Sequence, residues 1–302
     1  MLHLLLKANL NLMTQLILLL RPHQYVKNSF VLLGVVFSHQ WDNATLILAA
    51  LAFFAFCCMA SAVYVLNDIL DVEEDRQHPK KRYRPIANGT IAVPTAWGLF
   101  SILTAASILL GIGAGKLMPV MLSIYLVLNL AYSLRLKHVV ILDVFVISTG
   151  FMLRILGGTL GLGIAPSHWL LLCGLMLTLF LGFAKRRAEL LMLESFGEYS
   201  RATTRRVLDD YSPIMLEQYI AVSAACTILS YGLYTVSDST IALHGSDKLV
   251  YTVPFVVYGI FRYLFLLHHR QQGNDTAKDL LTDRHLLFTV LGWFVTCVVA
   301  LI

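Results

Sequence analysis

Residues 44–76 read ATLILAALAFFAFCCMASAVYVLNDILDVEEDR, an apolar run that leads without a break into a cluster of acids. The apolar part, residues 44–66, is long enough to cross the roughly 30 Å hydrocarbon core of a bilayer as a helix. Asn67, Asp71 and Asp75 then recur at every fourth position, so a helix stacks them on one face. The stretch predicts a membrane-spanning helix that carries polar oxygen groups at its C-terminal end.

The stacked acids predict a metal site. Carboxylates at this spacing repel one another unless a cation joins them. Carboxylate and amide oxygens suit Mg²⁺, which binds few protein groups and completes its shell with water and phosphate oxygens. A loop that only orients the chain in the membrane needs bases but no carboxylates. We therefore predict that Asn67, Asp71 and Asp75 hold Mg²⁺, with Asp68 beside them, and that the ion binds a diphosphate group.

The whole chain has the composition of a polytopic membrane protein. Of its 302 residues, 58% are hydrophobic and 14% are charged, and the mean hydropathy of +0.72 is too high for a soluble domain of this length. We expect one all-α integral membrane domain over residues 1–302, with residues 1–20 forming an amphipathic helix on the inner surface. Nine apolar stretches can span the bilayer, although a count of eight stays open. They are residues 24–38, 44–66, 91–113, 117–133, 139–162, 167–184, 212–236, 249–268 and 285–302.

The distribution of bases predicts which side faces the cytoplasm. With nine spans and the N-terminus inside, almost all of the 23 Lys and Arg residues fall in the inner segments, while the outer loops hold only Lys116 and Lys248. The acidic clusters therefore face the cytoplasm at an inner membrane. The net charge of +5 belongs mostly to these loops, so orientation and anionic substrates explain it better than nucleic acid does. The five cysteines lie in apolar spans without metal-ligand spacing.

A run of bases follows the acids, because residues 76–87 read RQHPKKRYRPIA. Together with NDILDVEEDR at residues 67–76, this pattern resembles the first aspartate-rich motif of the UbiA superfamily of intramembrane prenyltransferases. The resemblance implies a bundle of about nine transmembrane helices around a central cavity, with two aspartate-rich regions that face each other. It also implies Mg²⁺ as the cofactor and diphosphate as the leaving group.

A second acidic segment, DDYS at residues 209–212, lies where the superfamily carries its second motif. The resemblance implies that Asp210 faces the first motif across the cavity. The residue four positions beyond Asp210 is Ile214 rather than a carboxylate, so the second motif is partial. Another interpretation stays open, in which Asp209 only caps the helix that follows it.

Two further segments resemble one branch of the superfamily, the decaprenyl-phosphate phosphoribosyltransferases. They are RPHQYVKN at residues 21–28 and FAKRRAE at residues 183–189. In that branch a 5-phosphoribosyl group moves from 5-phosphoribosyl 1-diphosphate to a polyprenyl phosphate, and diphosphate leaves. The resemblance implies the same reaction here, in the synthesis of a cell-envelope glycan, with the membrane, the lipid phosphate and the sugar phosphate as partners.

Bases near the helix ends meet the needs of such a substrate pair, whose phosphates carry more charge than Mg²⁺ alone neutralises. Within the fifth span, Asp143 and Arg154 lie roughly 20° apart around a helix and therefore share a face. A charge inside a membrane usually lines a cavity or meets a partner. For any single base, the alternative is that its side chain only extends to place the charge at the membrane–water interface, without binding substrate. The predicted substrate-binding residues are Arg21, Gln24, Lys27, Arg82, Arg84, Tyr132, Lys137, Asp143, Arg154, Lys185, Arg186 and Asp210.

We expect four residues to act in catalysis: Asp68, Asp71, Asp75 and Lys27. The acids, with Mg²⁺, stabilise the charge that grows on the departing diphosphate, while bases position the phosphates and apolar walls hold the isoprenoid tail. Two alternatives remain. One is a prenyltransferase that moves a prenyl group from prenyl diphosphate to an aromatic or quinone-precursor acceptor, and the other is a non-catalytic lipid-phosphate carrier. The sequence leaves open the isoprenoid length and whether copies of the chain form a homo-oligomer.

Overall fold

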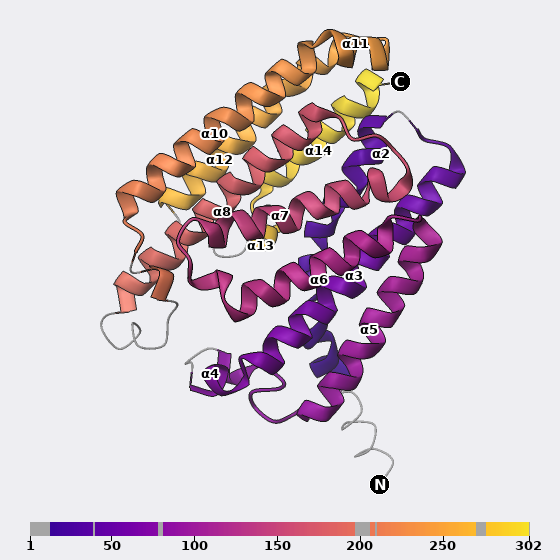
Figure 1. The fold of residues 1–302 in the computed structure, drawn as a ribbon. Coiled ribbons are helices and arrows are strands. Elements are labelled where there is room, and N and C mark those ends of the chain that lie inside the picture. Colours follow the sequence, from indigo (N-terminus) through magenta and orange to yellow (C-terminus); the bar gives the residue numbers. More distant parts are fainter. Residues whose placement is uncertain are drawn as a thin grey trace.

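The computed structural model describes residues 13–38, 40–77, 81–196, 206–208, 210–269 and 276–301 (Figure 1). These residues form helices and no strand, as the all-α prediction requires. After a helical stretch at residues 13–20, the elements in chain order are η1 (Pro22–Leu32), α2 (Leu33–Ser38), α3 (Asn43–Leu70), α4 (Val72–Gln77), η2 (Lys81–Tyr83), α5 (Val93–Ala114), α6 (Met118–Leu134), η3 (Leu136–His138), α7 (Leu142–Gly157), η4 (Leu160–Leu162), α8 (His168–Phe196), η5 (Arg206–Leu208), α10 (Pro213–Val236), α11 (Asp238–His244), η6 (Lys248–Thr252), α12 (Val253–His269), α13 (Thr276–Thr282) and α14 (Arg284–Leu301).

Most of the predicted spans are long helices. Within the described part of the chain, seven helical segments are long and apolar enough to cross a membrane: Asn43–Leu70, Val93–Ala114, Leu142–Leu162, His168–Met192, Pro213–Val236, Lys248–His269 and Arg284–Leu301. Helix α6 is also apolar but has only 17 residues. With the segment formed by η1 and α2, these elements account for the nine predicted stretches, and the predicted class is confirmed.

The first predicted span, residues 24–38, has an irregular form. Its larger part is the 3-10 helix η1 of 11 residues, and only Leu33–Ser38 is α-helical. Such long 3-10 runs are uncommon, because their hydrogen bonds have poorer geometry than those of an α-helix. Pro22 begins η1, and Arg21 before it has a left-handed backbone with φ of 53°. An apolar run predicts burial, but it does not distinguish the two kinds of helix.

The predicted surface helix at residues 1–20 lies only partly in the described chain. Residues 13–20 are helical. The side chains of Met13 and Ile17 are mostly exposed, whereas Leu19 is fully buried in a cluster with Val65. One apolar side that is buried and one that is exposed suit a helix lying along a membrane surface. The surface location itself stays a prediction.

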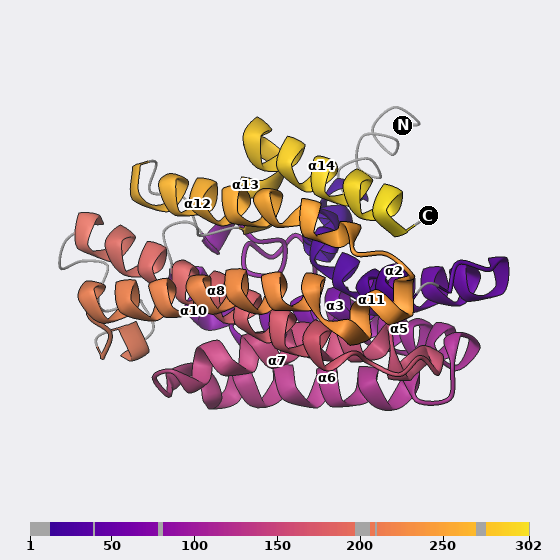
Figure 2. The same ribbon diagram turned by 90° about the horizontal axis from the view of Figure 1, so that it is seen from above.

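The long helices pack side by side in one bundle. Helix α3 packs along α5, α8 lies between α7 and α10, and α12 packs along α14. Seen from above in Figure 2, α6 and α7 lie on one side of the bundle and α12 and α14 lie on the other. The two ends of the described chain lie at opposite ends of the bundle, because Leu19 packs with Ile69 whereas Leu301 packs with Tyr234. This placement fits an odd number of crossings.

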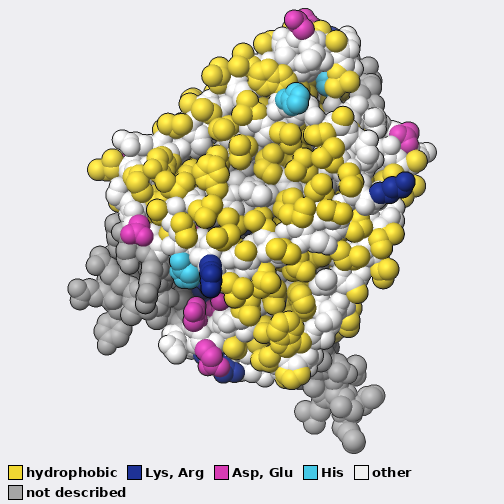
Figure 3. Space-filling view, in the orientation of Figure 1, with side chains coloured by type: hydrophobic (Ala, Val, Ile, Leu, Met, Phe, Trp, Pro, Cys, Tyr) yellow, Lys and Arg dark blue, Asp and Glu magenta, His cyan; other side chains and the backbone are white. Residues whose placement is uncertain are grey.

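A wide apolar surface surrounds the bundle. In Figure 3, hydrophobic side chains cover most of the visible face, and most of the charged side chains gather at the end that holds α4. Ile102, Leu109, Val127 and Leu229 are each more than 60% exposed. A patch of this extent is unfavourable in water, but the hydrocarbon core of a bilayer covers it. The chain is therefore an integral membrane protein.

Close backbone contact fixes η1 and α2 against the end of α7. A Cβ atom added to Gly158 would lie 1.7 Å from the carbonyl oxygen of Val31, and one added to Gly34 would lie 2.3 Å from the carbonyl oxygen of Gly158. No side chain fits in either place, so glycine permits the approach. The contact sets the position of the segment that carries Lys27.

An ion pair outside the site joins α12 to the start of α14. Asp283 caps α14, because its Oδ1 accepts a hydrogen bond from the backbone N–H of Leu286 at 3.0 Å. Its Oδ2 lies 2.8 Å from Nη2 of Arg262. The hydrogen bond from Arg262 lowers the pKa of Asp283 to about 2. The carboxylate therefore serves as a cap and as an ion-pair partner at once.

Substitutions of Asp283 separate these two roles. We expect Asp283→Ala to lower the free energy of unfolding by about 1–2 kcal/mol, because the cap is lost. Asp283→Asn keeps the cap and loses only the charge, so its destabilisation is smaller. Because the pKa is lowered by folding, the charge contributes stability above pH about 4, and this contribution disappears as the pH falls toward 2. Thermal unfolding should give a constant difference between wild type and Asp283→Asn from about pH 5 to 8 that closes in acid; a difference that grows with acid would contradict the ion pair.

Candidate active site at the mouth of the bundle

The acid-bearing stretch keeps helical spacing past the end of α3. Helix α3 ends at Leu70, yet the backbone N–H of Asp71 donates to the carbonyl of Asn67 at 2.9 Å, and that of Asp75 donates to the carbonyl of Asp71 at 2.8 Å. The three predicted metal ligands therefore follow one another at successive turns. The backbone spacing of the motif is therefore helical, whereas a shared metal site for the three side chains stays a prediction.

Two of these side chains face the end of α6 and the short helix η3. The Oδ1 atom of Asn67 accepts a hydrogen bond from the hydroxyl of Ser133 at 2.5 Å. One turn further along, Oδ1 of Asp71 lies 3.3 Å from Nζ of Lys137. The Asp71 carboxylate keeps about a quarter of its surface exposed, so a ligand can reach it. Ser133 was not among the predicted site residues.

The third predicted ligand, Asp75, and the neighbouring Asp68 are buried around one guanidinium group. Nη1 of Arg84 lies 3.0 Å from Oδ1 of Asp68 and 2.7 Å from Oδ2 of Asp75. Each carboxylate also has a second basic partner: Arg21 lies 2.6 Å from Asp68, and Lys81 lies 3.8 Å from Asp75. The side chains of Asp68 and Asp75 are 2% and 1% exposed, so both charges depend on these partners.

A second buried network lies beside the first, around Arg186 on α8. Its Nε atom lies 2.7 Å from Oδ2 of Asp143 on α7, and both side chains are fully buried. Its Nη2 atom donates to the hydroxyl of Tyr132 on α6 at 3.0 Å, and its Nη1 atom pairs with Glu189. Protein groups thus contact all three nitrogens of the guanidinium. Asp143 and Arg154, which share a face of α7, have separate partners.

Tyr211 connects this network to the second acidic segment. Its hydroxyl donates to Oδ1 of Asp143 at 2.7 Å and accepts from the backbone N–H of Ile141 at 2.6 Å. Burial and the hydrogen bond to Asp143 raise the pKa of Tyr211, so the hydroxyl stays protonated and can donate. The next residue toward the N-terminus, Asp210, is exposed. Asp209 lies outside the described residues.

Arg154 is enclosed deeper in the bundle. Its Nε atom donates to Oδ1 of Asn28 on η1 at 2.7 Å, Nη2 donates to the hydroxyl of Tyr125 at 2.9 Å, and Nη1 donates to the carbonyl of Gly150 at 2.8 Å. The guanidinium also lies 5.4 Å from the ring centre of Phe151. No carboxylate pairs with it among the described residues. Neutral dipoles and aromatic faces therefore stabilise this charge.

The remaining predicted bases are partly exposed. Lys185 lies 3.9 Å from Glu189 and keeps about a third of its side chain exposed. Arg82 is exposed and bonds to the hydroxyl of the neighbouring Tyr83, away from the acids in its described contacts. Gln24 and Lys27 are half-buried on η1. The structure thus brings most of the predicted residues to one end, but it places Arg82 on the outside.

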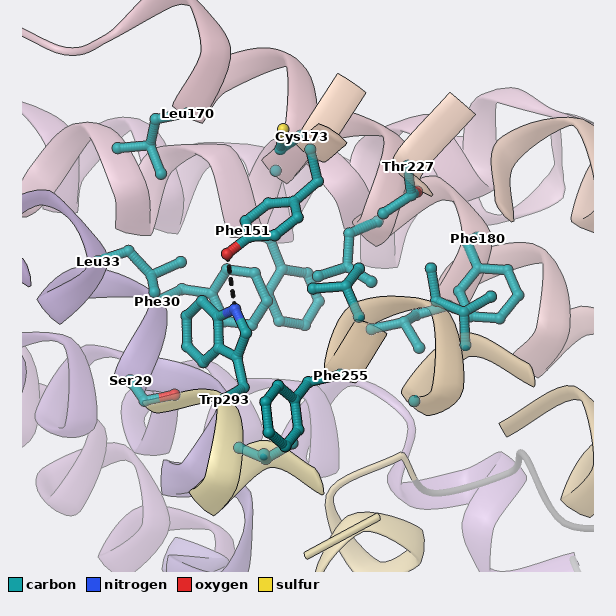
Figure 4. A pocket seen from close by; sticks show the side chains of 18 of the residues that line it. Ser29, Phe30, Leu33, Phe151, Leu170, Cys173, Phe180, Thr227, Phe255 and Trp293 are labelled. Carbon is teal, nitrogen blue, oxygen red and sulfur yellow. Dashed lines mark hydrogen bonds between the residues drawn. The ribbon is translucent and has the colours of Figure 1, made fainter. Parts of the chain in front are cut away.

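An apolar cavity of about 390 Å³ lies inside the bundle (Figure 4). Aromatic side chains from several helices line it, among them Phe30, Phe151, Phe255 and Trp293. The dashed line in Figure 4 marks the hydrogen bond of 2.8 Å that the indole N–H of Trp293 donates to the hydroxyl of Tyr231. Lys27 is the single charged residue of this lining. The cavity thus suits a hydrocarbon chain with an anionic end.

We call the end of the bundle that holds Asn67, Asp71 and Asp75 the mouth. The oxygen atoms of these side chains are of the chemical type that a hard cation binds. Among the described residues, no three His, Cys, Asp or Glu side chains gather closely enough to hold a metal ion by themselves. Carboxylate and amide oxygens of Asn67, Asp71 and Asp75 are nevertheless the donors that Mg²⁺ prefers. The Oδ1 atom of Asp75 is buried without a hydrogen-bond partner, so it has an acceptor position left. The residues fit an ion that takes the rest of its shell from phosphate and water.

A helical membrane bundle that carries paired acids and bases at one end and encloses an apolar cavity suits an intramembrane enzyme. The model of the UbiA prenyltransferase family matches residues 28–291. The chain belongs to this family of enzymes, as its sequence motifs predict.

Similar proteins agree with this assignment. The chain is 36% identical to the decaprenyl-phosphate phosphoribosyltransferase of Corynebacterium glutamicum, over 96% of this chain and 87% of that protein. It is 34% identical to the protein of the same name from Mycolicibacterium smegmatis, over 95% and 92% of the two chains. A UbiA homologue from Archaeoglobus fulgidus, solved bound to GPP and Mg²⁺, matches 95% of this chain and 99% of its own, with a TM-score of 0.69 and 15% identity.

Proposed function

We propose that the protein transfers a 5-phosphoribosyl group from 5-phosphoribosyl 1-diphosphate to a polyprenyl phosphate of the decaprenyl type. The observation that carries this proposal is the similarity, over nearly the whole chain, to relatives named decaprenyl-phosphate phosphoribosyltransferase. The two segments at residues 21–28 and 183–189 favour the same branch of the family. In the reaction, the bond from ribose C1 to the diphosphate oxygen breaks, and a bond from C1 to a lipid phosphate oxygen forms.

The donor is proposed to bind at the acids of the mouth. Asn67, Asp71 and Asp75 would hold Mg²⁺, and the ion, when bound, neutralises the diphosphate and the charge that grows on it as the bond to C1 breaks. Asp68 lies one residue from Asn67 and orients Arg84 and Arg21 by its two ion pairs. These bases are close enough to the acids to contact phosphate oxygens of the donor. Asp210 is proposed to contribute from the opposite side.

The acceptor is proposed to place its tail in the apolar cavity and its phosphate beside Lys27. Lys27 is the charged residue in a lining that is otherwise neutral and mostly apolar, so it attracts a single anionic group. The lipid phosphate oxygen is already ionised and needs no strong general base. Gln24 precedes Lys27 by one 3-10 turn on η1 and is proposed to donate to the same phosphate. Lys137, on η3 just after α6, and Lys185, in the C-terminal half of α8, would hold the remaining phosphate charge.

We further propose that the mouth faces the cytoplasm at the inner membrane. The clustered bases at this end of the bundle support that orientation, because cytoplasmic loops carry an excess of Lys and Arg. The sugar donor is water-soluble, so an entrance from the cytoplasm suits its delivery. Accessibility of a cysteine placed in the 81–90 loop to an impermeant thiol reagent, in sealed vesicles of known orientation, tests this topology.

A labelling experiment tests the proposed function. The purified protein, reconstituted with polyprenyl phosphate and Mg²⁺, is given 5-phosphoribosyl 1-diphosphate labelled in the ribose. We expect the label to enter the lipid fraction, and we expect chelation of divalent ions to abolish the transfer. Labelled prenyl diphosphate with an aromatic acid serves as the matched alternative. Transfer only in that arm would replace the proposed function by prenyl transfer, and transfer in neither arm would favour a carrier.

A further inference from the structure

Arg186 is the largest side chain that the described protein buries completely. Full burial of a guanidinium inside a membrane protein is unfavourable unless its donors and its charge are matched. Asp143 and Glu189 supply two carboxylates and Tyr132 supplies a hydroxyl, so a protein group lies against each of the three nitrogens. The contact of Nε with Asp143 is an ion pair of 2.7 Å without hydrogen-bond geometry. Because its side chain has no exposed surface, Arg186 is placed to hold protein groups together.

The first branch of this network leads to the predicted metal ligands. Tyr132, which accepts from Arg186 at 3.0 Å, precedes Ser133 on α6. The hydroxyl of Ser133 donates to Oδ1 of Asn67 at 2.5 Å. A displacement of Tyr132 therefore moves the group that orients Asn67. Arg186 thus acts on the first acidic segment through the end of α6.

The second branch leads to the second acidic segment. Arg186 holds Asp143, Asp143 accepts from the hydroxyl of Tyr211, and Tyr211 follows Asp210 directly in the chain. The same hydroxyl accepts from the N–H of Ile141, whose backbone has a φ of 67°. A positive φ is strained for a β-branched residue and persists only where the surroundings hold it. Tyr211 is thus fixed from two sides at the start of α7.

We infer that Arg186 is a positioning residue that fixes the distance between the two acidic segments across the mouth, rather than a ligand of substrate phosphate. The inference rests on the proposed function, because it assigns the two segments to one donor site. A planar guanidinium is needed for this task, since it presents donors in three directions. A lysine keeps the charge but reaches only one or two of the three partners.

Steady-state kinetics of Arg186→Lys tests the inference. We expect the KM of the sugar donor and the Mg²⁺ concentration for half-maximal rate to rise about tenfold, because the second contact shell of a metal site typically changes its affinity by 10–100-fold. The KM of the polyprenyl phosphate should stay unchanged. Arg187→Lys is the matched control: the adjacent arginine is also buried but pairs with Glu217 and with the carbonyl of Leu267, and its variant should keep both KM values.

Tyr211→Phe provides a milder variant in case Arg186→Lys does not fold. It removes one hydroxyl and interrupts only the branch through Asp143. We therefore expect the donor KM to rise about threefold, which is less than the rise of about tenfold expected of Arg186→Lys. In the double variant that combines Arg186→Lys with Tyr211→Phe, the factor by which the donor KM rises should be smaller than the product of the factors for the two single variants, because both substitutions act through one network. Unchanged KM values with a lower kcat or unfolding temperature would reduce Arg186 to a structural role. A rise confined to the acceptor KM would make it a lipid-phosphate ligand, and either result overturns the inference.

A binding measurement separates this inference from the proposed reaction. Thermal unfolding of each variant is followed while Mg²⁺ and inorganic diphosphate are added together. We expect Arg186→Lys to need about ten times more diphosphate than wild type or Arg187→Lys for the same stabilisation. This result would stand even if the labelled sugar were never transferred. Equal titrations for wild type and Arg186→Lys would refute the positioning role, whatever the substrates are.

Discussion

Replacing Asp71 by asparagine is expected to lower the rate of transfer about 100- to 1,000-fold while leaving the fold intact. Asp71 is more accessible than the other predicted carboxylate ligand, with 25% of its side chain exposed against 1% for Asp75, and it is partnered by Lys137 at 3.3 Å. Loss of the negative charge would weaken the hold on the proposed Mg²⁺, and such an ion typically contributes several kcal/mol to stabilising a leaving diphosphate. Each tenfold loss in rate corresponds to about 1.4 kcal/mol. Label transfer at saturating donor, with Mg²⁺ varied, measures the effect.

Glu73→Gln is the control for Asp71→Asn. It removes the same charge two residues away, but Glu73 is exposed, and its ion pair within the described part of the chain is with Arg76 on the surface, at 2.6 Å. Its rate should stay within about twofold of wild type, as expected for a surface ion pair. Both variants should unfold close to the wild-type temperature. If Asp71→Asn were as active as Glu73→Gln, then Asp71 would not bind the metal and the assignment of the first motif would fail.

Local patterns in the sequence predicted the spans and the acidic motif well. Helix α3 extends over Asn43–Leu70 and so contains the predicted span 44–66. The four-residue period of Asn67, Asp71 and Asp75 survives the break between α3 and α4, because the backbone hydrogen bonds continue across it. Such patterns depend only on neighbours along the chain, and a single sequence contains that information.

Pairings between distant segments could not be predicted in this way. Arg154 was expected to bind substrate because a charge inside a membrane span usually lines a cavity or meets a partner. In the structure its Nε atom donates to Asn28, which is 126 residues away in the chain. No pattern in the sequence marks Asn28 or Tyr125 as its partners. In the same way, the contact of Arg84 with both Asp68 and Asp75 depends on how the 81–90 loop folds back. The direct substrate contact expected of Arg154 stays a prediction, whereas for Arg186 the protein contacts point to the positioning role inferred above.

The cavity is another feature that only the three-dimensional arrangement reveals. Its aromatic lining comes from several helices, and each aromatic residue in isolation resembles any other residue of a membrane span. Lys27 was selected from the sequence as one base of a motif. Its special property, that it is the single charge of an apolar lining, depends on where η1 lies against α7. This position favours the proposed contact of Lys27 with the lipid acceptor more strongly than the motif alone does.

Arg84→Met is expected to destabilise the protein by about 2–3 kcal/mol and to make its stability depend on Mg²⁺. One nitrogen of Arg84 contacts both Asp68 and Asp75, and removing a partner of a buried ion pair typically costs about 3–5 kcal/mol. The loss is smaller here because Arg21 and Lys81 remain beside the two carboxylates.

The same variant distinguishes a metal site from a purely structural ion-pair cluster. Without Arg84, two buried carboxylates repel each other, so a cation that binds them stabilises the folded state more than it stabilises wild type. Thermal unfolding with and without Mg²⁺ should give a larger shift for Arg84→Met than for wild type. Arg82→Met is the control, because Arg82 is exposed and contacts Tyr83; its stability and its Mg²⁺ response should equal those of wild type. If Mg²⁺ leaves Arg84→Met as unstable as before, the acids of the mouth do not gather around a divalent ion.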